Sequence, residues 1–287
     1  MNKVQKLNAV GAGQQGFTLV ELVIVIVISG ILAGALTNFI AQPIQGYTDL
    51  ARRATLVNAA DNALRRMARD VHQALPNSIR VSGTALEMLN AVDGARYRDD
   101  PPPGDTNKRL EFNKVDTEFN LLGRLLDTRA RPFNTTSRFV IYNVGVADAD
   151  AYETGSDVIS PAGTATVSDD GTEDHITLSS GMQFLFPSPT QRLYLVDTPI
   201  SYLCDGSNLY RYAGYPIIQG QVATDAGLMA QAGVTRALVT NQVDTCGFTY
   251  QPGTSQRAGL VTLTLTLTDS SGEKITLLHQ VHVDNTP

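Results

Sequence analysis

Glu21 is the residue whose type and position are least expected in this sequence. It is the only charged side chain between Phe17 and Ala41, a run of 25 residues that is otherwise apolar or small and polar. About 20 such residues span a bilayer, and a carboxylate inside a span costs about 2.5–3.5 kcal/mol on insertion scales. An acid kept there indicates a charge-pairing role. The alternative is a solvated acid that snorkels to the membrane interface.

Other groups that could carry chemistry are few. The sequence has no nucleophile elbow, no phosphate-binding loop and no glycine-rich dinucleotide motif, so we expect no enzyme activity and no cofactor. His279 and His282 lie three apart on a predicted strand and point to opposite faces, so we expect no metal there. The acidic segment 169–174 offers the oxygen ligands that calcium prefers, without EF-hand spacing. We favour a solvated loop, and calcium stays the alternative.

The two cysteines, Cys204 and Cys246, are too few to ligate zinc alone. In an exported protein they would form a disulfide, worth about 4 kcal/mol in the chain-entropy model. In a reducing compartment they would be buried free thiols. Tyrosines around Cys204 suit either a binding surface or a packed core, and we expect the core. They are Tyr194, Tyr202, Tyr210, Tyr212 and Tyr215.

A long helix is predicted to carry Glu21. After the apolar run, apolar residues recur at helical spacing over 44–75, with arginine and asparagine on the other face. Pro43 interrupts the passage between the two halves, so we predict one helix over 17–75 that is bent near Pro43. At 1.5 Å per residue it would be on the order of 90 Å long. Asp70 lies four residues after Arg66, the spacing of a local ion pair. The apolar positions are Ile44, Tyr47, Ala51, Ala54, Val57, Leu64, Met67, Val71 and Leu75.

After the helix the pattern changes to strands and loops. Leucines and threonines alternate over 260–268, which with 275–283 predicts a hairpin whose leucine face lies against the helix. Loops are predicted at 101–105 and over 145–175. We expect one globular head. Further strands are predicted over 138–144, 191–196, 199–204 and 209–212, with a turn at 204–208.

The distribution of charge indicates how the chain would be oriented in a membrane, and it argues against nucleic acid as a partner. Lys3 and Lys6 precede the apolar run, and positive charge near a span stays cytoplasmic, which places the head outside. The net charge is −6, and residues 1–16 contain no acid, so their removal would leave an even more acidic body. An acidic body argues against nucleic acid as a partner. An ordinary secretory signal is the alternative, but it would have a shorter apolar core.

The segment Gly16-Phe17-Thr18-Leu19-Val20-Glu21, between a basic head and an apolar run, resembles the N-terminal signature of type IV prepilins and pseudopilins. The resemblance implies an α+β type IV pilin fold. In this fold a long N-terminal helix, half transmembrane and half amphipathic, packs on an antiparallel β-sheet head with one disulfide. The implied divisions are a cleaved leader 1–16, a transmembrane helix 17–42, an amphipathic helix 43–75 and a periplasmic head 76–287.

The resemblance also implies roles for individual residues. A membrane prepilin peptidase would cut after Gly16 and methylate the new amino terminus on Phe17. Glu21 of one subunit would meet the Phe17 amine of a neighbour as the filament assembles. The implied partners are other pilin subunits, the peptidase and the inner membrane. The chain would cross that membrane once, with a cytoplasmic N-terminus and a periplasmic head, and would later reach the pilus.

Two segments of the head resemble particular members of this superfamily. Residues 193–212 resemble a segment of large minor pilins, and the ending 277–287 resembles that of a minor pilin of the mannose-sensitive haemagglutinin (MSHA) pilus. This predicts a minor pilin that supports pilus biogenesis and surface attachment. One alternative is a J-type minor pseudopilin of type II secretion. Another is an adhesive binding module whose ligand is met by the loops of 145–190.

Overall fold

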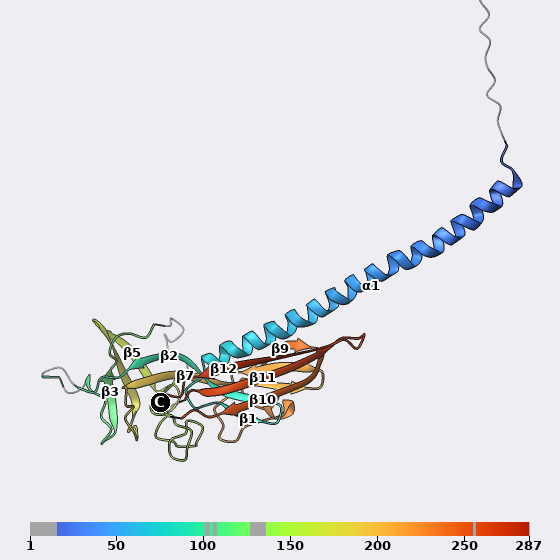
Figure 1. Ribbon diagram of the computed structural model, residues 1–287. Coiled ribbons are helices and arrows are strands. Elements are labelled where there is room, and N and C mark those ends of the chain that lie inside the picture. Colours follow the sequence, from blue (N-terminus) through green and yellow to red (C-terminus); the bar gives the residue numbers. More distant parts are fainter. Residues whose placement is uncertain (1–15, 101–103, 106–107, 127–135, 255–256, 287) are drawn as a thin grey trace, which may run out of the picture. The chain divides into compact units, whose positions relative to one another are not determined.

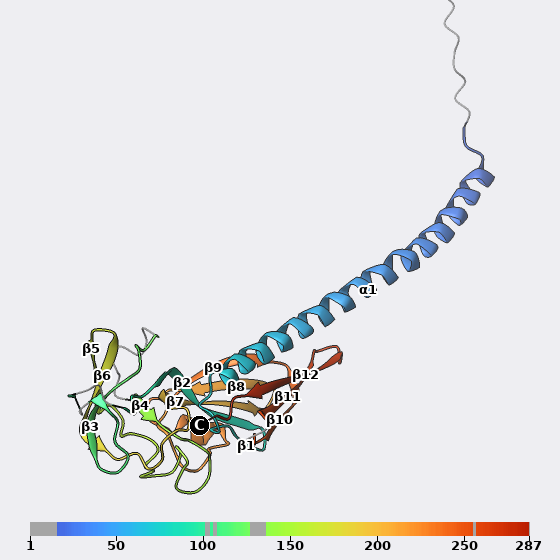
Figure 2. The same ribbon diagram turned by 60° about the vertical axis from the view of Figure 1, so that its left-hand side comes forward.

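The computed structural model describes residues 16–100, 104–105, 108–126, 136–254 and 257–286, with backbone only for 37–38 and 40–44. Residues 1–15 of the predicted leader and prolines 101–103 of the predicted loop lie outside the described residues. The chain divides into two compact units, residues 1–52 and 53–287. The second unit therefore begins within the predicted amphipathic helix. Figures 1 and 2 show the elements in two orientations.

Helix α1 runs from Leu19 to His72 and continues through Pro43. The predicted bend near Pro43 stays a prediction. The helix ends three residues before the predicted Leu75, because there the backbone begins to pair with strand β2 (Ala85–Arg96). The Leu75 amide donates to the carbonyl of Leu89 at 2.8 Å, and the Ala91 amide donates to that of Gln73 at 2.9 Å.

The largest sheet has the order β1-β2-β7-β8-β9, and β4 pairs with part of β7. All of its pairs are antiparallel. The turn predicted at 204–208 is confirmed between β7 and β8. The strands are β1 (Arg80–Ser82), β2, β4 (Arg138–Val140), β7 (Arg192–Asp205), β8 (Asn208–Ala213) and β9 (Thr235–Asn241).

Three predicted strands of this sheet differ from the structure in extent. The segments 191–196 and 199–204 are one strand, β7, which pairs along its length with β2 through two register shifts. Pro199 lies between the part of β7 that pairs with β4 and the part that pairs with β8. Its missing N–H therefore removes no hydrogen bond to either of those strands. The strand predicted over 138–144 stops at Val140, and Tyr142 has a φ of 61°, outside the β region.

The C-terminal sheet confirms the predicted hairpin. It contains β10 (Val243–Gln251), β11 (Gly259–Thr268) and β12 (Lys274–Val283), all antiparallel. Along β11 the side chains of Leu263, Leu265 and Leu267 are buried, and the threonines between them are half-buried.

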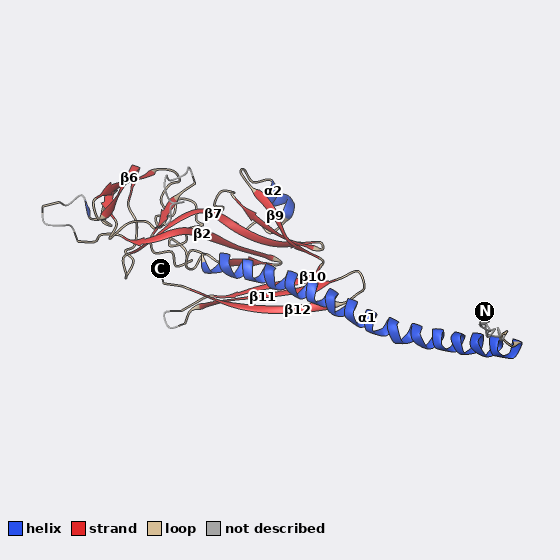
Figure 3. Cartoon of the chain, turned by 90° about the horizontal axis from the view of Figure 1, so that it is seen from above, coloured by secondary structure: helices blue, strands red, loops and turns tan. Residues whose placement is uncertain are grey.

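The part of α1 that belongs to the second unit packs against both of these sheets (Figure 3). The predicted positions Leu64, Met67 and Val71 are buried, as expected. The prediction was wrong at its start, because Tyr47 is 75% exposed and burial begins at Leu56. It also missed small residues that allow close approach. These are Ala60, Ala63 and Ala68.

A third sheet joins β3 (Asp116–Asn120), β6 (Glu173–Met182) and β5 (Ala165–Asp170) in that order. It corrects the loop predicted over 145–175, because β5 and the start of β6 form a hairpin there. Gly171, with φ of 81°, lies at its turn. A short helix, α2 (Asp225–Met229), lies between β8 and β9 and is capped by the Thr224 side chain.

Candidate processing and assembly site

The predicted cleavage site lies just outside helix α1. Gly16, Phe17 and Thr18 precede its first residue, and all three are exposed. The Phe17 side chain is 80% exposed. A peptide bond outside the helical hydrogen-bond ladder can be reached without unwinding a turn. The geometry therefore leaves the Gly16–Phe17 bond open to a peptidase.

Thr18 caps the helix, a role that the sequence analysis missed. Its Oγ1 accepts a hydrogen bond from the Glu21 amide at 3.3 Å, and the Leu22 amide donates to its carbonyl at 3.2 Å. Threonine followed three residues later by glutamate is the capping-box pattern, which the sequence contains. The helix thus starts two residues after the predicted new amino terminus, at a position fixed by Thr18.

Glu21 occupies the third position of α1, in its first turn. Among the described residues its carboxylate forms no hydrogen bond or ion pair with a side chain. The helix dipole favours an anion in the first turn by about 0.3–1 kcal/mol, which is less than the cost of placing an acid in hydrocarbon. The helix start therefore favours the Glu21 carboxylate without fully compensating the cost of placing it in hydrocarbon.

The first part of α1 presents apolar side chains on all sides. Residues Leu19–Leu36 are long and apolar enough to cross a membrane. A helix apolar all round either spans a membrane or packs among other helices. The large apolar side chains that are at least 50% exposed are Leu19, Val20, Leu22, Val23, Ile24, Val25, Ile26, Val27, Ile28, Ile31, Leu32 and Leu36.

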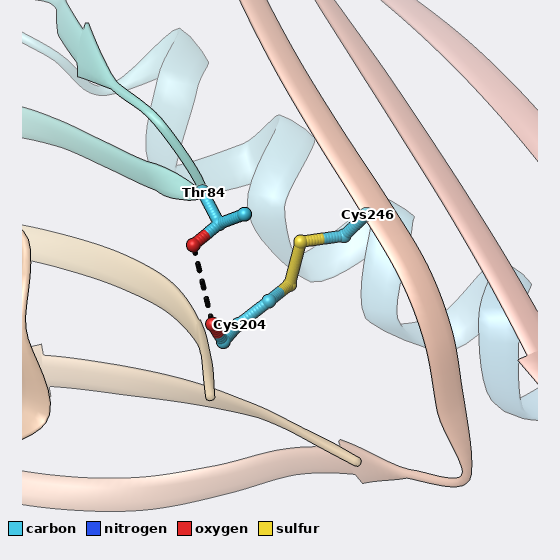
Figure 4. The surroundings of a disulfide bond; sticks show 3 residues. All are labelled: Thr84, Cys204 and Cys246. Atoms are coloured by element: carbon cyan, nitrogen blue, oxygen red, sulfur yellow. Dashed lines mark hydrogen bonds between the residues drawn. A yellow bond between two sulfur atoms is a disulfide. The ribbon is translucent and has the colours of Figure 1, made fainter. Parts of the chain in front are cut away.

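Cys204 and Cys246 form the predicted disulfide (Figure 4). Cys204 lies near the end of β7 and Cys246 on β10, with their Cα atoms 6.6 Å apart. The bond joins the largest sheet to the C-terminal sheet beside α1. Thr84 fixes the Cys204 backbone, since its Oγ1 donates to the Cys204 carbonyl at 3.2 Å and its carbonyl accepts from the Cys204 amide.

The tyrosines near Cys204 belong mostly to the core, as expected. Tyr202, Tyr212 and Tyr215 are at most 1% exposed, and the other two are half-buried. Burial raises the pKa of each buried phenol above its usual value. These side chains therefore support the fold and do not form an aromatic binding surface.

The acidic segment 169–174 is bound by the protein's own cations. Lys108 Nζ lies 2.7 Å from Asp170, Arg124 lies 2.8 Å from Asp169, and Arg98 pairs with Glu173. Residues 169–172 are nevertheless exposed at the turn between β5 and β6, as expected of a solvated segment, and the ion pairs hold that turn in place. Among the described residues no group of three or more histidine, cysteine, aspartate or glutamate side chains is arranged to hold a metal.

The histidines do not form a site. His279 and His282 are exposed on opposite faces of β12. His175 Nδ1 lies 2.7 Å from Asn120 Oδ1, and its Nε2 lies 3.3 Å from Glu118. Both contacts are within the third sheet.

Comparison with known proteins places the N-terminal segment in a described family model. A family model described as the prokaryotic N-terminal methylation motif matches residues 11–37. It supports a type IV pilin or pseudopilin, a class of structural subunits that a prepilin peptidase processes and that assemble with other pilin subunits. No curated protein and no solved structure matches the chain. The α+β architecture, an apolar N-terminal helix followed by antiparallel sheets with one disulfide, is type IV pilin-like, and the apolar helix fits single-pass anchoring.

Proposed function

We propose that the chain is a minor subunit of an MSHA-type type IV pilus, most similar to the O-type minor pilin. It would be anchored in the inner membrane, taken into the filament or its priming complex, and support pilus biogenesis and surface attachment. The main support for this proposal is that the methylation motif continues directly into an exposed apolar helix whose first turn is capped by Thr18. The resemblance of 193–212 and 277–287 to minor pilins supports the finer assignment.

The proposed processing follows from the start of α1. The peptidase removes the leader 1–16 by cutting after Gly16, and Phe17 becomes the methylated amino terminus. Residues 17–42 then remain in the inner membrane with the N-terminus on the cytoplasmic side, 43–75 continue the stem, and 76–287 form the periplasmic head. The accessible backbone before Leu19 supports the cut at this position.

The proposed assembly step pairs two charges that are both poorly solvated. Cleavage creates an amine on Phe17, and Glu21 lies four residues later in the same exposed apolar region. The amine of one subunit would meet the Glu21 carboxylate of its neighbour, which removes the cost of an uncompensated acid in a low-dielectric phase. The chain would act as a structural subunit and not as an enzyme.

N-terminal sequencing of the protein from membranes tests the processing. We expect the mature chain to begin at a methylated Phe17, and the subunit to be recovered in sheared filaments. A chain that keeps Met1, or one cut beyond residue 41, would overturn the assignment. A J-type minor pseudopilin would give the same amino terminus, so deletion strains decide between the two: loss of piliation supports the pilin, and loss of type II secretion with normal pili supports the pseudopilin.

One observation favours an additional adhesive role for the head. A cavity of about 780 Å³ is lined mainly by residues 151–157, in the loop before β5, and by residues 180–183, at the end of β6. Surface attachment by a strain altered only in these loops, with piliation measured in parallel, tests this role.

A further inference from the structure

The cavity in the 151–161 and 180–185 segments has the size of a small-molecule site. Its volume of about 780 Å³ falls in the range of about 300–1,000 Å³ that is usual for ligand pockets. Two of its walls are tied together by a backbone hydrogen bond. The Leu185 amide donates to the Asp157 carbonyl at 3.1 Å, and both residues line the cavity. The cavity is therefore formed before any ligand binds.

Arg138 provides a cation on the cavity wall. Its Nη1 donates to the Ser160 carbonyl at 3.1 Å, and the described residues supply no carboxylate partner. The side chain is half-buried, and this burial lowers the pKa of its guanidinium. A guanidinium has five N–H donors that suit a carboxylate in a two-pronged geometry. A bound anion would supply the counter-charge that Arg138 lacks within the described part of the chain.

Two acidic side chains, Glu153 and Asp157, also line this cavity, and they can bind only hydrogen-bond donors of a ligand. Glu153 uses its Oε2 to accept the Asp148 amide at 2.9 Å, and the Asp157 side chain is exposed. An ionised carboxylate only accepts hydrogen bonds, so the ligand has to present O–H or N–H donors beside its anionic group. A plain carboxylate lacks these donors, and a neutral sugar lacks the anion.

Apolar side chains complete the walls. Ile159 and Met182 are buried and Leu185 is 40% exposed, and all three line the cavity. They offer a surface for the C–H face of a ring, with the polar groups of Ser156 and Ser180 beside it. Apolar walls with a few placed polar groups are the usual composition of a ligand site.

We propose that this cavity binds a sugar acid, a pyranose that carries one carboxylate, as in a uronate unit of an acidic polysaccharide. The Arg138 guanidinium binds the carboxylate, and Glu153 and Asp157 accept the ring hydroxyls. The proposal deepens the adhesive role considered for the head and rests on it, but it does not depend on assembly into a pilus.

Titration calorimetry with the full-length protein in detergent micelles tests the proposal, because binding there needs no filament. The probes are sodium D-glucuronate, D-glucose, sodium acetate and a short peptide with a free carboxyl terminus. We expect glucuronate to bind at least about tenfold more tightly than the other three, the effect of one charge-assisted contact. Arg138→Gln should weaken glucuronate binding at least about tenfold. Arg96→Gln, which lies in a different cavity, should leave it unchanged.

Several results would overturn the proposal. They are no measurable glucuronate binding, equal affinity for glucose, tighter binding of the peptide, and an Arg138→Gln variant that binds normally. If Arg138→Gln does not fold, Ser180→Asp adds a negative charge at an exposed position of the same cavity. This second variant should also weaken glucuronate binding, and unchanged affinity would contradict the proposal. Because piliation and N-terminal processing are measured separately, failure of the sugar site and failure of the pilin assignment remain distinguishable.

Discussion

The Oδ2 atom of Asp70 on α1 lies 2.6 Å from the Nε atom of Arg211 on β8. The same oxygen accepts the Tyr202 hydroxyl at 2.7 Å. Burial opposes the charged form of Arg211, but the hydrogen bond and charge of Asp70 hold the pKa of Arg211 above its usual value. One carboxylate near the end of the helix therefore joins it to two strands of the largest sheet.

Replacing this carboxylate should weaken the helix–sheet contact. Asp70→Asn leaves the partly buried Arg211 without a counter-charge, so we expect the free energy of unfolding to fall by about 2–3 kcal/mol. Urea unfolding of the full-length protein measures it. Asp61→Asn is the matched control, because Asp61 and Arg65 form an exposed pair at 2.7 Å on the same helix worth about 0.3–0.5 kcal/mol. Equal losses in the two variants would contradict the assignment.

Asp70 also illustrates what the sequence could and could not predict. Its spacing from Arg66 predicted a local pair, but its partner Arg211 is 141 residues away, and no periodicity connects them. By contrast, the alternation of 260–268 predicted β11 and its buried face, because a strand pattern is local. The hairpin of β5 and β6 was missed because its turn residues and many acids looked like a loop.

The candidate sites likewise include one that the sequence could predict and one that it could not. Gly16, Phe17 and Glu21 lie within one short segment of the sequence, so the methylation motif is visible in the sequence itself, and so is the capping-box spacing of Thr18 and Glu21. The cavity around Arg138 could not be predicted. Its walls come from separate segments that meet only in the folded head, and none of them contains a motif.

The disulfide should contribute strongly to the stability of the head. Replacing Cys204 and Cys246 together by serine opens a link between residues 42 apart, and the chain-entropy model gives a loss of about 4 kcal/mol. Urea unfolding of the double variant against the oxidised protein measures the loss. Mass mapping without reductant should find the linked peptide in native protein. Free thiols in protein taken from the periplasm would contradict the bond.

Glu87 should give the head an unusual dependence on pH. It is 1% exposed and lies 2.8 Å from Arg80, and burial raises the pKa of Glu87 although Arg80 and Ser201 lower it. Because the pKa of Glu87 is higher in the folded state than its ordinary value of 4.5, its protonated form stabilises the folded protein at a pH below 4.5. This contribution to stability is lost as the pH rises through the folded-state pKa. The stability of the wild-type protein relative to Glu87→Gln should therefore fall as pH increases above 4.5.

The urea midpoint of both proteins, measured across this pH range, tests the prediction. Gln cannot titrate, so position 87 adds no pH dependence to the variant, and the slope of the stability difference between the two proteins reports the titration of Glu87. A difference that stays constant or rises with pH would show that the Glu87 pKa is not raised.

Gly214 and Gly233 require glycine because their backbones meet. A Cβ at Gly214 would lie 2.7 Å from the Gly233 carbonyl oxygen, and both residues have positive φ. Gly214→Ala should therefore lower the free energy of unfolding by about 2–3 kcal/mol, from steric overlap and backbone strain together. Gly206→Ala is the control, because Gly206 has a φ of 56° and open space around it, so only about 1 kcal/mol is expected. A Gly214 variant no less stable than the control would contradict the close approach.

Glu21 should matter for assembly and not for insertion. Glu21→Ala removes an acid that costs free energy in lipid, so the subunit should insert at least as well. The helix cap survives, because the backbone amide of Glu21, and not its carboxylate, donates to Thr18. The neighbouring Phe17 amine would lose its counter-charge, and docking should weaken by on the order of 1–3 kcal/mol. Membrane level, processing at Phe17 and piliation, assayed separately, measure the three effects.

Two further variants separate charge from helix capping at the same turn. Thr18→Ala removes the cap oxygen and leaves the Glu21 charge, so it should cost about 0.5–2 kcal/mol of helix stability with piliation close to normal. Glu21→Asp keeps the charge, one methylene shorter, and should restore part of the assembly lost in Glu21→Ala. Normal piliation by Glu21→Ala, with normal amounts of the subunit in sheared filaments, would remove the carboxylate from the mechanism. Loss of the Glu21→Ala protein from the membrane would mean that the residue acts on stability instead.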